Sequence, residues 1–421
     1  MTSARVELGR HLFYDKRLSI NETQSCATCH QQDKAFTDGR KLAVGSTGET
    51  HPRSSMSIVN IAYTPVLTWA NPNMKSLERQ ALVPMFGEHP VELGMSGMEK
   101  DLIAKLRQEV RYQNLFPAAF PGQEDPYTID NITRAISSFE RILISGDSPY
   151  DHYLNGDRTA ISPSAKRGES LFFSERLECF HCHGGFNFSQ TTDHIGKAFA
   201  EIEFHNTGLY NLDKKGSYPK ENQGVYEITQ KEEDIGRFRA PSLRNIALTA
   251  PYMHDGSIET LDDVIAHYSA GGRTIEDGPF RGVGSENPNK STFVKGFTLT
   301  PREKSDLINF LKSLTDENFL TNPRFSDPWP EPLAAISADL ERSSFSGRVI
   351  GISRGSARLI IKHDHVEGMM GQMTMPFRVK DPDGMKHLKV GDSITAEMIT
   401  NLKTGAIWLE KVKPKVKSPK P

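Results

Sequence analysis

The sequence predicts a mainly α-helical chain of two similar domains, followed by a small five-stranded β-barrel. Three observations lead to this fold class. The motif Cys-x-x-Cys-His occurs twice, at residues 26–30 and 179–183. Short patterns recur in the same order around both copies, which is typical of tandem domains. Beyond residue 345 the chain changes to short alternating runs separated by turns, as in strands.

The composition describes an ordinary globular protein. The 421 residues allow two to four domains, and 37% apolar and 25% charged residues are average values. The formal net charge of -2 gives no electrostatic reason to expect nucleic acid as a partner. No apolar run is long enough to predict a membrane span. Residues 1–10 lack the apolar segment of a secretory signal, so we expect the numbering to begin at a mature or truncated terminus.

Both motifs have the spacing that attaches a c-type haem. Two thiols form thioethers with the vinyl groups of one porphyrin, and the histidine that follows binds the iron as proximal ligand. The residues are Cys26, Cys29 and His30 in the first copy and Cys179, Cys182 and His183 in the second. The motifs use all four cysteines, which disfavours a redox dithiol or a zinc site. Attachment of haem c takes place outside the bacterial inner membrane, so the cofactor predicts a periplasmic protein.

The repeated patterns predict two tandem cytochrome-c-like haem domains. Amphipathic helices expected at 4–13 and 165–172 share Gly-x-x-Leu-Phe. Asn60-Ile61-Ala62 precedes Trp69 and Leu77, as Asn245-Ile246-Ala247 precedes His254 and Leu261. A helix expected at 129–145 ends in a Gly- and Pro-containing stretch. We therefore place the domains at 1–155 and 156–322.

The C-terminal part begins after a well-marked helix. Thr300 is the expected N-cap, with Pro301 at the first position and Glu303 completing a capping box. Residues 323–344 are interpreted as a linker and 414–421 as a disordered tail. Strands are expected at 347–352, 357–362, 375–379, 393–398 and 407–412. They predict an OB-type β-barrel over residues 345–413.

Residues 5–325 resemble the bacterial di-haem cytochrome c peroxidase/MauG superfamily. The resemblance rests on blocks that occur in the family's order at residues 35–39, 76–84, 238–245 and 248–256. Within it, Trp69-Ala70-Asn71-Pro72-Asn73 and residues 86–94, 206–210 and 267–273 are most similar to the methanobactin-associated MbnH type. Members of that type are thought to use the oxidising power of peroxide to modify a tryptophan on a copper-binding partner.

The resemblance implies that the first haem reacts with peroxide. Cleavage of peroxide needs a base that takes a proton from one oxygen and returns it to the other. Glu92 matches the family's catalytic carboxylate, with Gln80 as its hydrogen-bonding neighbour. The spacing between them is two residues longer than in the common pattern, so Glu88 remains an alternative. His51 lies one residue from the position of a displaceable histidine in some peroxidases, and we expect it to be an exposed loop residue.

The resemblance also implies a closed second haem. Tyr268 matches its sixth ligand, and a tyrosinate favours high iron valence. Met253 and His267 are alternatives, although His267 faces about 100° away on the same helix. Trp69 matches the indole that lies between the two haems and relays electrons. Asn60, Thr249 and Pro251 match a calcium site between the domains, for which carbonyl oxygens are suitable ligands.

The predicted barrel contains a candidate copper site and resembles the CusF-like periplasmic family. Thioethers with one imidazole select Cu(I). Met373 and Met375 alternate by two and so point to one face of a strand. His363 is the expected imidazole, with His365 as an alternative. Met370 stands where that family carries a capping tryptophan.

Together these features predict a periplasmic oxidoreductase. We expect hydrogen peroxide to generate a high-valent di-haem state that oxidises a side chain, most readily a tryptophan, of a copper-related partner protein. One alternative is a cytochrome c peroxidase supplied with electrons by a small redox protein. Another is a non-catalytic electron carrier or copper-handling protein.

Overall fold

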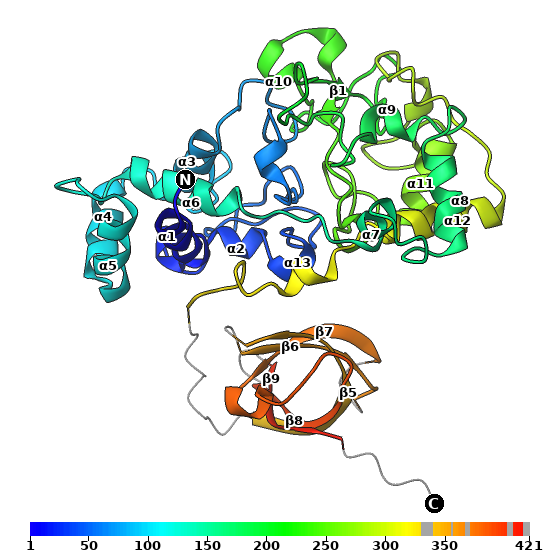
Figure 1. Cartoon of the computed structure of the whole chain (residues 1–421). Helices are drawn as coiled ribbons and strands as arrows, with labels where there is room; N and C mark the ends of the chain where they lie inside the picture. The colour runs from blue at the N-terminus through cyan, green and yellow to red at the C-terminus, as the bar shows by residue number, and fades with distance from the viewer. Residues whose placement is uncertain (330–339, 355–356, 367–370, 402–406, 416–421) are drawn as a thin grey trace, which may run out of the picture. The chain divides into compact units, whose positions relative to one another are not determined.

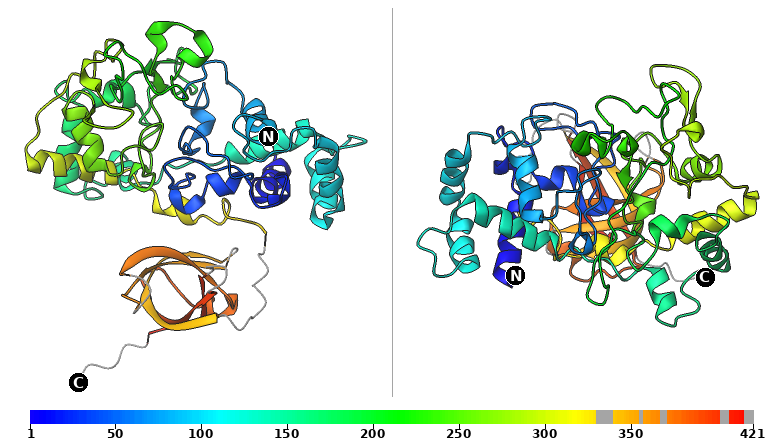
Figure 2. Two further views of the ribbon diagram at one scale, coloured as in Figure 1. Left: turned by 180° about the vertical axis from the view of Figure 1, so that it is seen from behind. Right: turned by 90° about the horizontal axis from the view of Figure 1, so that it is seen from above.

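The computed structural model describes residues 1–329, 340–354, 357–366, 371–401 and 407–415. It divides into two compact units, Met1–Phe319 and Leu320–Pro421 (Figure 1). The first unit contains two helical regions, which lie at its two sides (Figures 1 and 2). The second contains the barrel. No helix of the described residues is long and apolar enough to cross a membrane.

The first helical region is built on the crossing of two helices, α1 and α6. Its helices are α1 (Ser3–Tyr14), α2 (Cys26–Cys29), α3 (Leu77–Phe86), α4 (Glu99–Gln108), α5 (Val110–Ala119) and α6 (Ile129–Glu140). A Cβ at Gly9 would lie 1.9 Å from the Ala135 carbonyl oxygen, so only glycine permits this close approach of α1 to α6. The helix predicted at 129–145 is shorter than expected. It ends at Glu140, because the backbone beyond turns to bond Asn60.

The second helical region repeats this arrangement with α8 and α12. Its helices are α7 (Pro149–Leu154), α8 (Pro163–Phe172), α9 (Cys179–His183), α10 (Tyr226–Thr229), α11 (Leu261–Ser269) and α12 (Pro301–Lys312). The next helix, α13 (Glu317–Thr321), returns to the first region, where Phe319 packs against Phe36 (Figure 1). Its short strands pair as β1 (Phe204–His205) with β2 (Phe238–Arg239), and β3 (Thr274–Ile275) with β4 (Gly282–Val283). A Cβ at Gly168 would lie 2.0 Å from the Asp306 carbonyl oxygen. The predicted capping box of Thr300 and Glu303 is present.

The two regions also repeat one turn. Asn60 and Asn245 both have a left-handed backbone, with φ of 56° and 61°, and each begins a 3₁₀ helix. The Asn60 amide donates to the Leu143 carbonyl at 2.8 Å, and the Asn245 amide donates to the Leu314 carbonyl at 3.0 Å. This repetition supports the prediction of two tandem domains and gives a residue-by-residue correspondence between them.

The second unit is a closed five-stranded barrel. Its strands are β5 (Leu340–Ser353), β6 (Arg358–His363), β7 (Met373–Val379), β8 (Ser393–Asn401) and β9 (Ile407–Pro414), in the order β5-β6-β7-β9-β8. All five predicted strands are present. The first begins at Leu340, inside the predicted linker, because its N-terminal half pairs with β8. A separate apolar core fills the barrel, including Phe345, Val349, Leu359, Phe377 and Leu409.

Candidate active site

The first cavity surrounds the first Cys-x-x-Cys-His motif. Cys26, Cys29 and His30 line it. Ser25 caps α2 in a capping box with Thr28, which fixes the helix that carries both thiols. The His30 Nδ1 atom lies 2.9 Å from the Phe36 carbonyl oxygen. A ring N–H donated to a carbonyl places the lone pair on Nε2, which is the tautomer that binds iron.

The predicted peroxide-reacting residues also line the first cavity. Gln80 and Pro84, on α3, and Glu92, from the loop after it, line the cavity. Glu88 is exposed and accepts a hydrogen bond from Ser96 at 2.8 Å, away from the cavity. Burial raises the pKa of Glu92 to about 7. The placement therefore favours Glu92 over Glu88 as the proton-transferring carboxyl.

The loop that carries Glu92 is held by backbone contacts from residues 45–49. A Cβ at Gly45 would lie 1.9 Å from the Val91 carbonyl oxygen, so the two segments touch. The Ser46 amide donates to the Glu92 carbonyl at 2.6 Å. The Glu49 carboxylate accepts from the Val91 amide at 3.1 Å. These contacts position Glu92 although it lies outside any helix or strand.

The expectation that His51 is an exposed loop residue is wrong. Its side chain is half-buried and lines the first cavity, where its Nε2 lies 4.0 Å from Glu92 Oε1. An isolated bridge between Val44 and Thr50 turns this loop back toward the motif. Burial lowers the pKa of His51. The cavity therefore holds an imidazole beside its carboxyl.

The second cavity surrounds Cys179, Cys182 and His183 and is mainly apolar. The His183 Nδ1 atom lies 3.2 Å from the Phe188 carbonyl oxygen, which repeats the geometry of His30. Burial lowers the pKa of His183 to about 4, so the ring stays neutral and able to bind a metal.

Tyr268 and Met253 both line the second cavity, and His267 does not. Tyr268 and His267 are adjacent on α11 and therefore point in different directions. His267 is buried elsewhere, with a pKa lowered to about 4 by burial. The placement favours Tyr268 or Met253 over His267 as a sixth ligand. Burial raises the pKa of the Tyr268 hydroxyl, so an anionic form needs a cation beside it.

The internal repeat shows how the two cavities differ. Ser76 caps α3 just before Leu77, and Thr260 caps α11 just before Leu261, so the two helices correspond. Counting from these leucines, Pro84 corresponds to Tyr268 and Gln80 to Val264, and all four line their cavities. Proline offers no ligand atom where the second region offers a phenol. At this position the first cavity therefore has no side chain that could bind a metal, whereas the second has a phenol.

Trp69 and His254 lie at corresponding positions and contact each other. Their ring centroids are 6.5 Å apart, edge to face. The Ser54 amide donates to the His254 carbonyl at 2.9 Å, and the Arg239 amide donates to the Trp69 carbonyl at 2.8 Å. Both rings line the second cavity. Because each comes from a different region, the pair joins the two regions through aromatic side chains.

A buried guanidinium indicates an acidic ligand in the second cavity. Arg239 is 5% exposed and lines that cavity. Its Nε donates to the Thr68 carbonyl at 3.0 Å, and its Nη2 lies 3.6 Å from Met56 Sδ. Burial lowers its pKa to about 10, and no carboxylate pairs with it among the described residues. A buried cation needs an anionic partner, which the propionates of a haem would provide.

The residues of the candidate copper site lie on β6 and β7. His363 pairs directly with Met373 across the two strands, so both side chains are on one face. His363 is fully buried; its Nδ1 lies 2.7 Å from the Asp364 carbonyl, and its Nε2 has no hydrogen-bond partner among the described residues. Met373 is 49% exposed, and Met375 packs against the core. His365 is exposed. Met370 lies outside the described residues.

Comparisons with known proteins agree with this geometry. A profile described as di-haem cytochrome c peroxidase matches residues 3–159. MauG of Methylophilus methylotrophus is 32% identical over 315 residues, which cover 75% of this chain and 83% of MauG. The chain belongs to the di-haem cytochrome c peroxidase family. It is therefore an oxidoreductase, and the family implies two haem c groups, which the two cavities fit.

Two further relatives extend the comparison. The cytochrome-c peroxidase IdrP1 of Denitromonas iodatirespirans is 32% identical over 352 residues, covering 78% of this chain and 84% of IdrP1. A solved MauG-like protein associated with microbial copper homeostasis is 49% identical with a TM-score of 0.76, covering 78% of this chain and 94% of that protein. A profile of the copper binding periplasmic protein CusF matches residues 342–413, so the barrel is a CusF-like domain.

The hydrogen bonds of the Asn60 side chain do not support the prediction that it binds calcium. The Asn60 side chain donates to the Ser145 carbonyl at 2.9 Å and to Asn187 Oδ1 at 3.1 Å, and its oxygen accepts from the Ser145 amide at 2.8 Å. Its carboxamide thus fastens the buried turn between the regions. Calcium at Thr249 and Pro251 stays a prediction.

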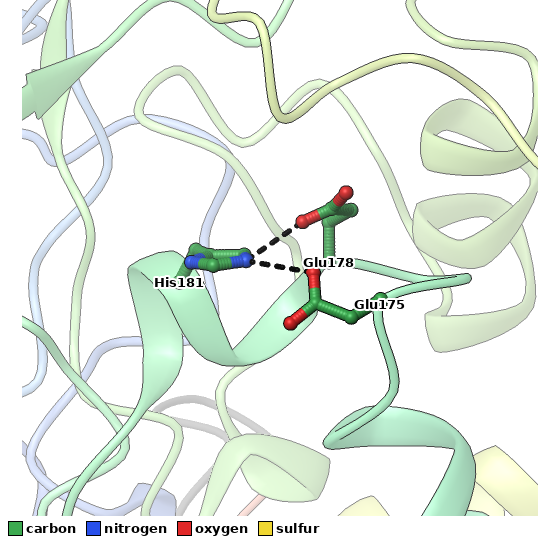
Figure 3. A group of neighbouring side chains, drawn as sticks. All are labelled: Glu175, Glu178 and His181. Atoms are coloured by element: carbon green, nitrogen blue, oxygen red, sulfur yellow. Dashed lines mark ion pairs between the residues drawn. The ribbon is translucent and has the colours of Figure 1, made fainter.

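A group of two carboxylates and an imidazole lies beside the second haem motif (Figure 3). His181 Nε2 is 2.8 Å from Glu178 and 3.5 Å from Glu175. Glu178 also pairs with Lys295 at 3.0 Å, and the His181 ring stacks on Phe293. Since Lys295 and His181 both lie against Glu178, the group is a polar cluster at the motif helix α9 in which Glu178 already has a cationic partner.

Proposed function

We propose that the protein is a periplasmic oxidoreductase that uses hydrogen peroxide to oxidise a side chain, most readily a tryptophan, of a copper-related partner protein. The observation that carries the proposal is the difference between the cavities. Pro84 offers no ligand atom in the first cavity, which Glu92 also lines, whereas Tyr268 at the corresponding position of the second cavity would offer a phenol to the iron. The 49% identical neighbour associated with copper homeostasis supports the copper connection.

The haem at the first site would supply an iron that binds and reduces peroxide. The chain's own residues handle the protons. Glu92 would take a proton from one peroxide oxygen and deliver it to the other, and its pKa of about 7 suits both roles. Gln80, which lines the same cavity, offers an amide donor that would orient the substrate. Reduction of one peroxide to two waters consumes two protons and two electrons, and the partner's side chain provides the electrons.

Trp69 and the second haem would connect the partner with the first haem. The indole N–H donates to the Ser54 carbonyl at 3.0 Å, which fixes the ring between the regions. The aromatic pair of Trp69 and His254 gives electrons a short path across that boundary. A phenolate from Tyr268 would stabilise the second iron in its oxidised forms.

The barrel would bind Cu(I) through His363, Met373 and Met375. The buried Nε2 of His363 needs a partner, and a soft metal beside two thioethers would satisfy it. The strand order 1-2-3-5-4, counted within the barrel, supports the OB-type assignment. The match to a periplasmic copper protein supports the periplasmic location.

Adding hydrogen peroxide to the fully oxidised protein tests the proposal. We expect a long-lived change in the spectra of both haems that decays when a partner is oxidised. Rapid turnover only after one-electron reduction would instead support a cytochrome c peroxidase, an alternative favoured by relatives such as IdrP1. Two low-spin haems that ignore peroxide would contradict both and leave an electron carrier.

The partner can be identified by its product. We expect mass spectrometry of a copper-related protein co-expressed with this enzyme to show oxidised tryptophan, dependent on peroxide and on Glu92. A matched co-expression with the Glu92→Gln variant is the control. Equal modification with and without Glu92 would contradict the proposed route.

A further inference from the structure

A second carboxyl, Glu140, lines the first cavity and has no role in the peroxide chemistry described above. It is the last residue of α6, is 7% exposed, and borders the same cavity as Cys26 and Glu92. Its Oε2 atom is fully buried and has no hydrogen-bond partner among the described residues. A buried polar atom without a partner costs free energy, so this one requires an explanation.

The internal repeat shows that the carboxyl is specific to the first haem. Ala135 of α6 contacts Gly9, and Asp306 of α12 contacts Gly168 in the same way, so the two helices correspond. The same difference in residue number also pairs Leu143 with Leu314, whose carbonyls accept equivalent hydrogen bonds. Glu140 then corresponds to Leu311, which lines the second cavity. The same position therefore holds a carboxyl at the first haem and a leucine at the second, so the helix crossing itself does not require the carboxyl.

The charges near Glu140 compensate its negative charge less than burial disfavours it. The adjacent cation, Arg141, is paired with Glu78 at 2.7 Å. Phe139 at this end of α6 packs against Phe13 and Tyr14 of α1. The titratable and charged groups around the site, among the described residues, are Arg141, Glu78, Tyr14, Cys26, Cys29, His30, Glu49, His51 and Glu92. Burial raises the pKa of Glu140 to about 8, so the neutral acid is the stable form without a nearby positive charge.

We propose that Glu140 is the redox-linked proton site of the first haem: it holds a proton while that haem is reduced and releases it into the cavity when the haem is oxidised. Loss of one electron adds one positive charge at the iron, and loss of one proton from Glu140 balances that charge. The electron leaves to the oxidant, and the proton leaves to the cavity that Glu92 and His51 border. This role of Glu140 deepens the proposed function and depends on it for one point, the use made of the proton. The first haem site would consume protons when it reduces peroxide, and Glu140 would release one proton into that site for each electron that the haem loses.

The test is the pH dependence of the two haem reduction potentials in the full-length protein with both haems attached. Ionised Glu140 stabilises the oxidised haem, and the positive charge of that haem lowers the pKa of the carboxyl below its value of about 8. The first potential should therefore fall as pH rises toward about 8, by up to about 59 mV per pH unit for one proton per electron, and level off above it. The second haem, with Leu311 in place, is the internal control and should show no such fall.

Variants separate Glu140 from the other acid of the cavity. Glu140→Gln, or Glu140→Leu if the first does not fold, should abolish most of the fall, and Glu92→Gln should leave it. An unchanged slope in the Glu140 variants, or a slope lost only in Glu92→Gln, would overturn the inference. Peroxide reactivity is recorded on the same wild-type sample. Reactivity without a slope contradicts only the role of Glu140, whereas a slope without reactivity contradicts only the proposed function.

Discussion

At the scale of single residues, Glu92 and Glu88 differ in surroundings and not in chemistry. Both carboxyls lie in one loop, but only Glu92 faces the first cavity, held there by contacts from residues 45–49. Replacing Glu92 by Gln removes the proton carrier and keeps the shape. We expect the rate constant for reaction with peroxide to fall by about 10² to 10⁴-fold, measured by stopped-flow absorbance. Glu88→Gln is the control; a comparable loss there would contradict the assignment.

The same carboxyl predicts a pH dependence. Burial raises the pKa of Glu92 to about 7, and only the ionised form can take a proton from peroxide. The rate constant should therefore be low below this pKa, rise as pH passes through about 7, and level off above it. In Glu92→Gln that rise should vanish from the pH profile. A wild-type profile that falls over the same range would show that the protonated form is the active one.

Tyr268 gives a prediction for the second haem. Tyr268→Phe removes only the oxygen, so the second haem should lose its sixth ligand and change from a low-spin to a high-spin absorption and electron paramagnetic resonance spectrum. Met253→Leu serves as the matched variant, because Met253 lines the same cavity. A low-spin signal that survives in Tyr268→Phe and disappears in Met253→Leu would assign the ligand to methionine.

At the scale of elements, the helix crossings depend on two glycines. The Cβ of alanine at position 9 would overlap the Ala135 carbonyl, which forces α1 away from α6. We expect Gly9→Ala to lower the free energy of unfolding by about 1–3 kcal/mol, seen as a lower melting temperature of the first unit. Gly146→Ala is the control, because a Cβ there would meet nothing within 4 Å. Equal melting temperatures for Gly9→Ala and wild type would contradict the crossing.

Elements whose signals are local were predictable from the sequence, and those that depend on tertiary contacts were not. The capping box at Thr300 and the strand that carries Met375 depend on neighbouring residues, and both are present. The end of α6 and the start of β5 are set by distant partners, Asn60 and β8, and were misplaced. The exposure predicted for His51 was wrong for the same reason, since its loop places it near Glu92.

The role proposed for Glu140 depends on comparing the two helical regions residue by residue. The sequence shows the repeated Gly-x-x-Leu-Phe and Asn-Ile-Ala patterns, but the pairing of Glu140 with Leu311 requires the corresponding helix crossings. Whether a glutamate at a helix end is buried or solvated is decided by packing, and most are solvated. The motifs identified the haem sites, and only the tertiary structure showed how their surroundings differ.

At the scale of the whole molecule, the chain consists of two units with separate cores. The core of the barrel is formed by residues of β5–β9 and the segments between them, and the haem cavities are lined entirely by residues of the first unit. We therefore expect a chain ending at residue 329 to keep both haem spectra and the peroxide rate constant of the full-length protein. Cu(I) binding should be lost with the barrel, measured by competition with a coloured chelator.

In the full-length protein, His363→Ala and Met373→Leu should each weaken Cu(I) binding while leaving the haem spectra unchanged. If removing the barrel, or copper binding to it, altered the peroxide rate constant of the first haem, the units would be energetically coupled and copper would act on turnover itself.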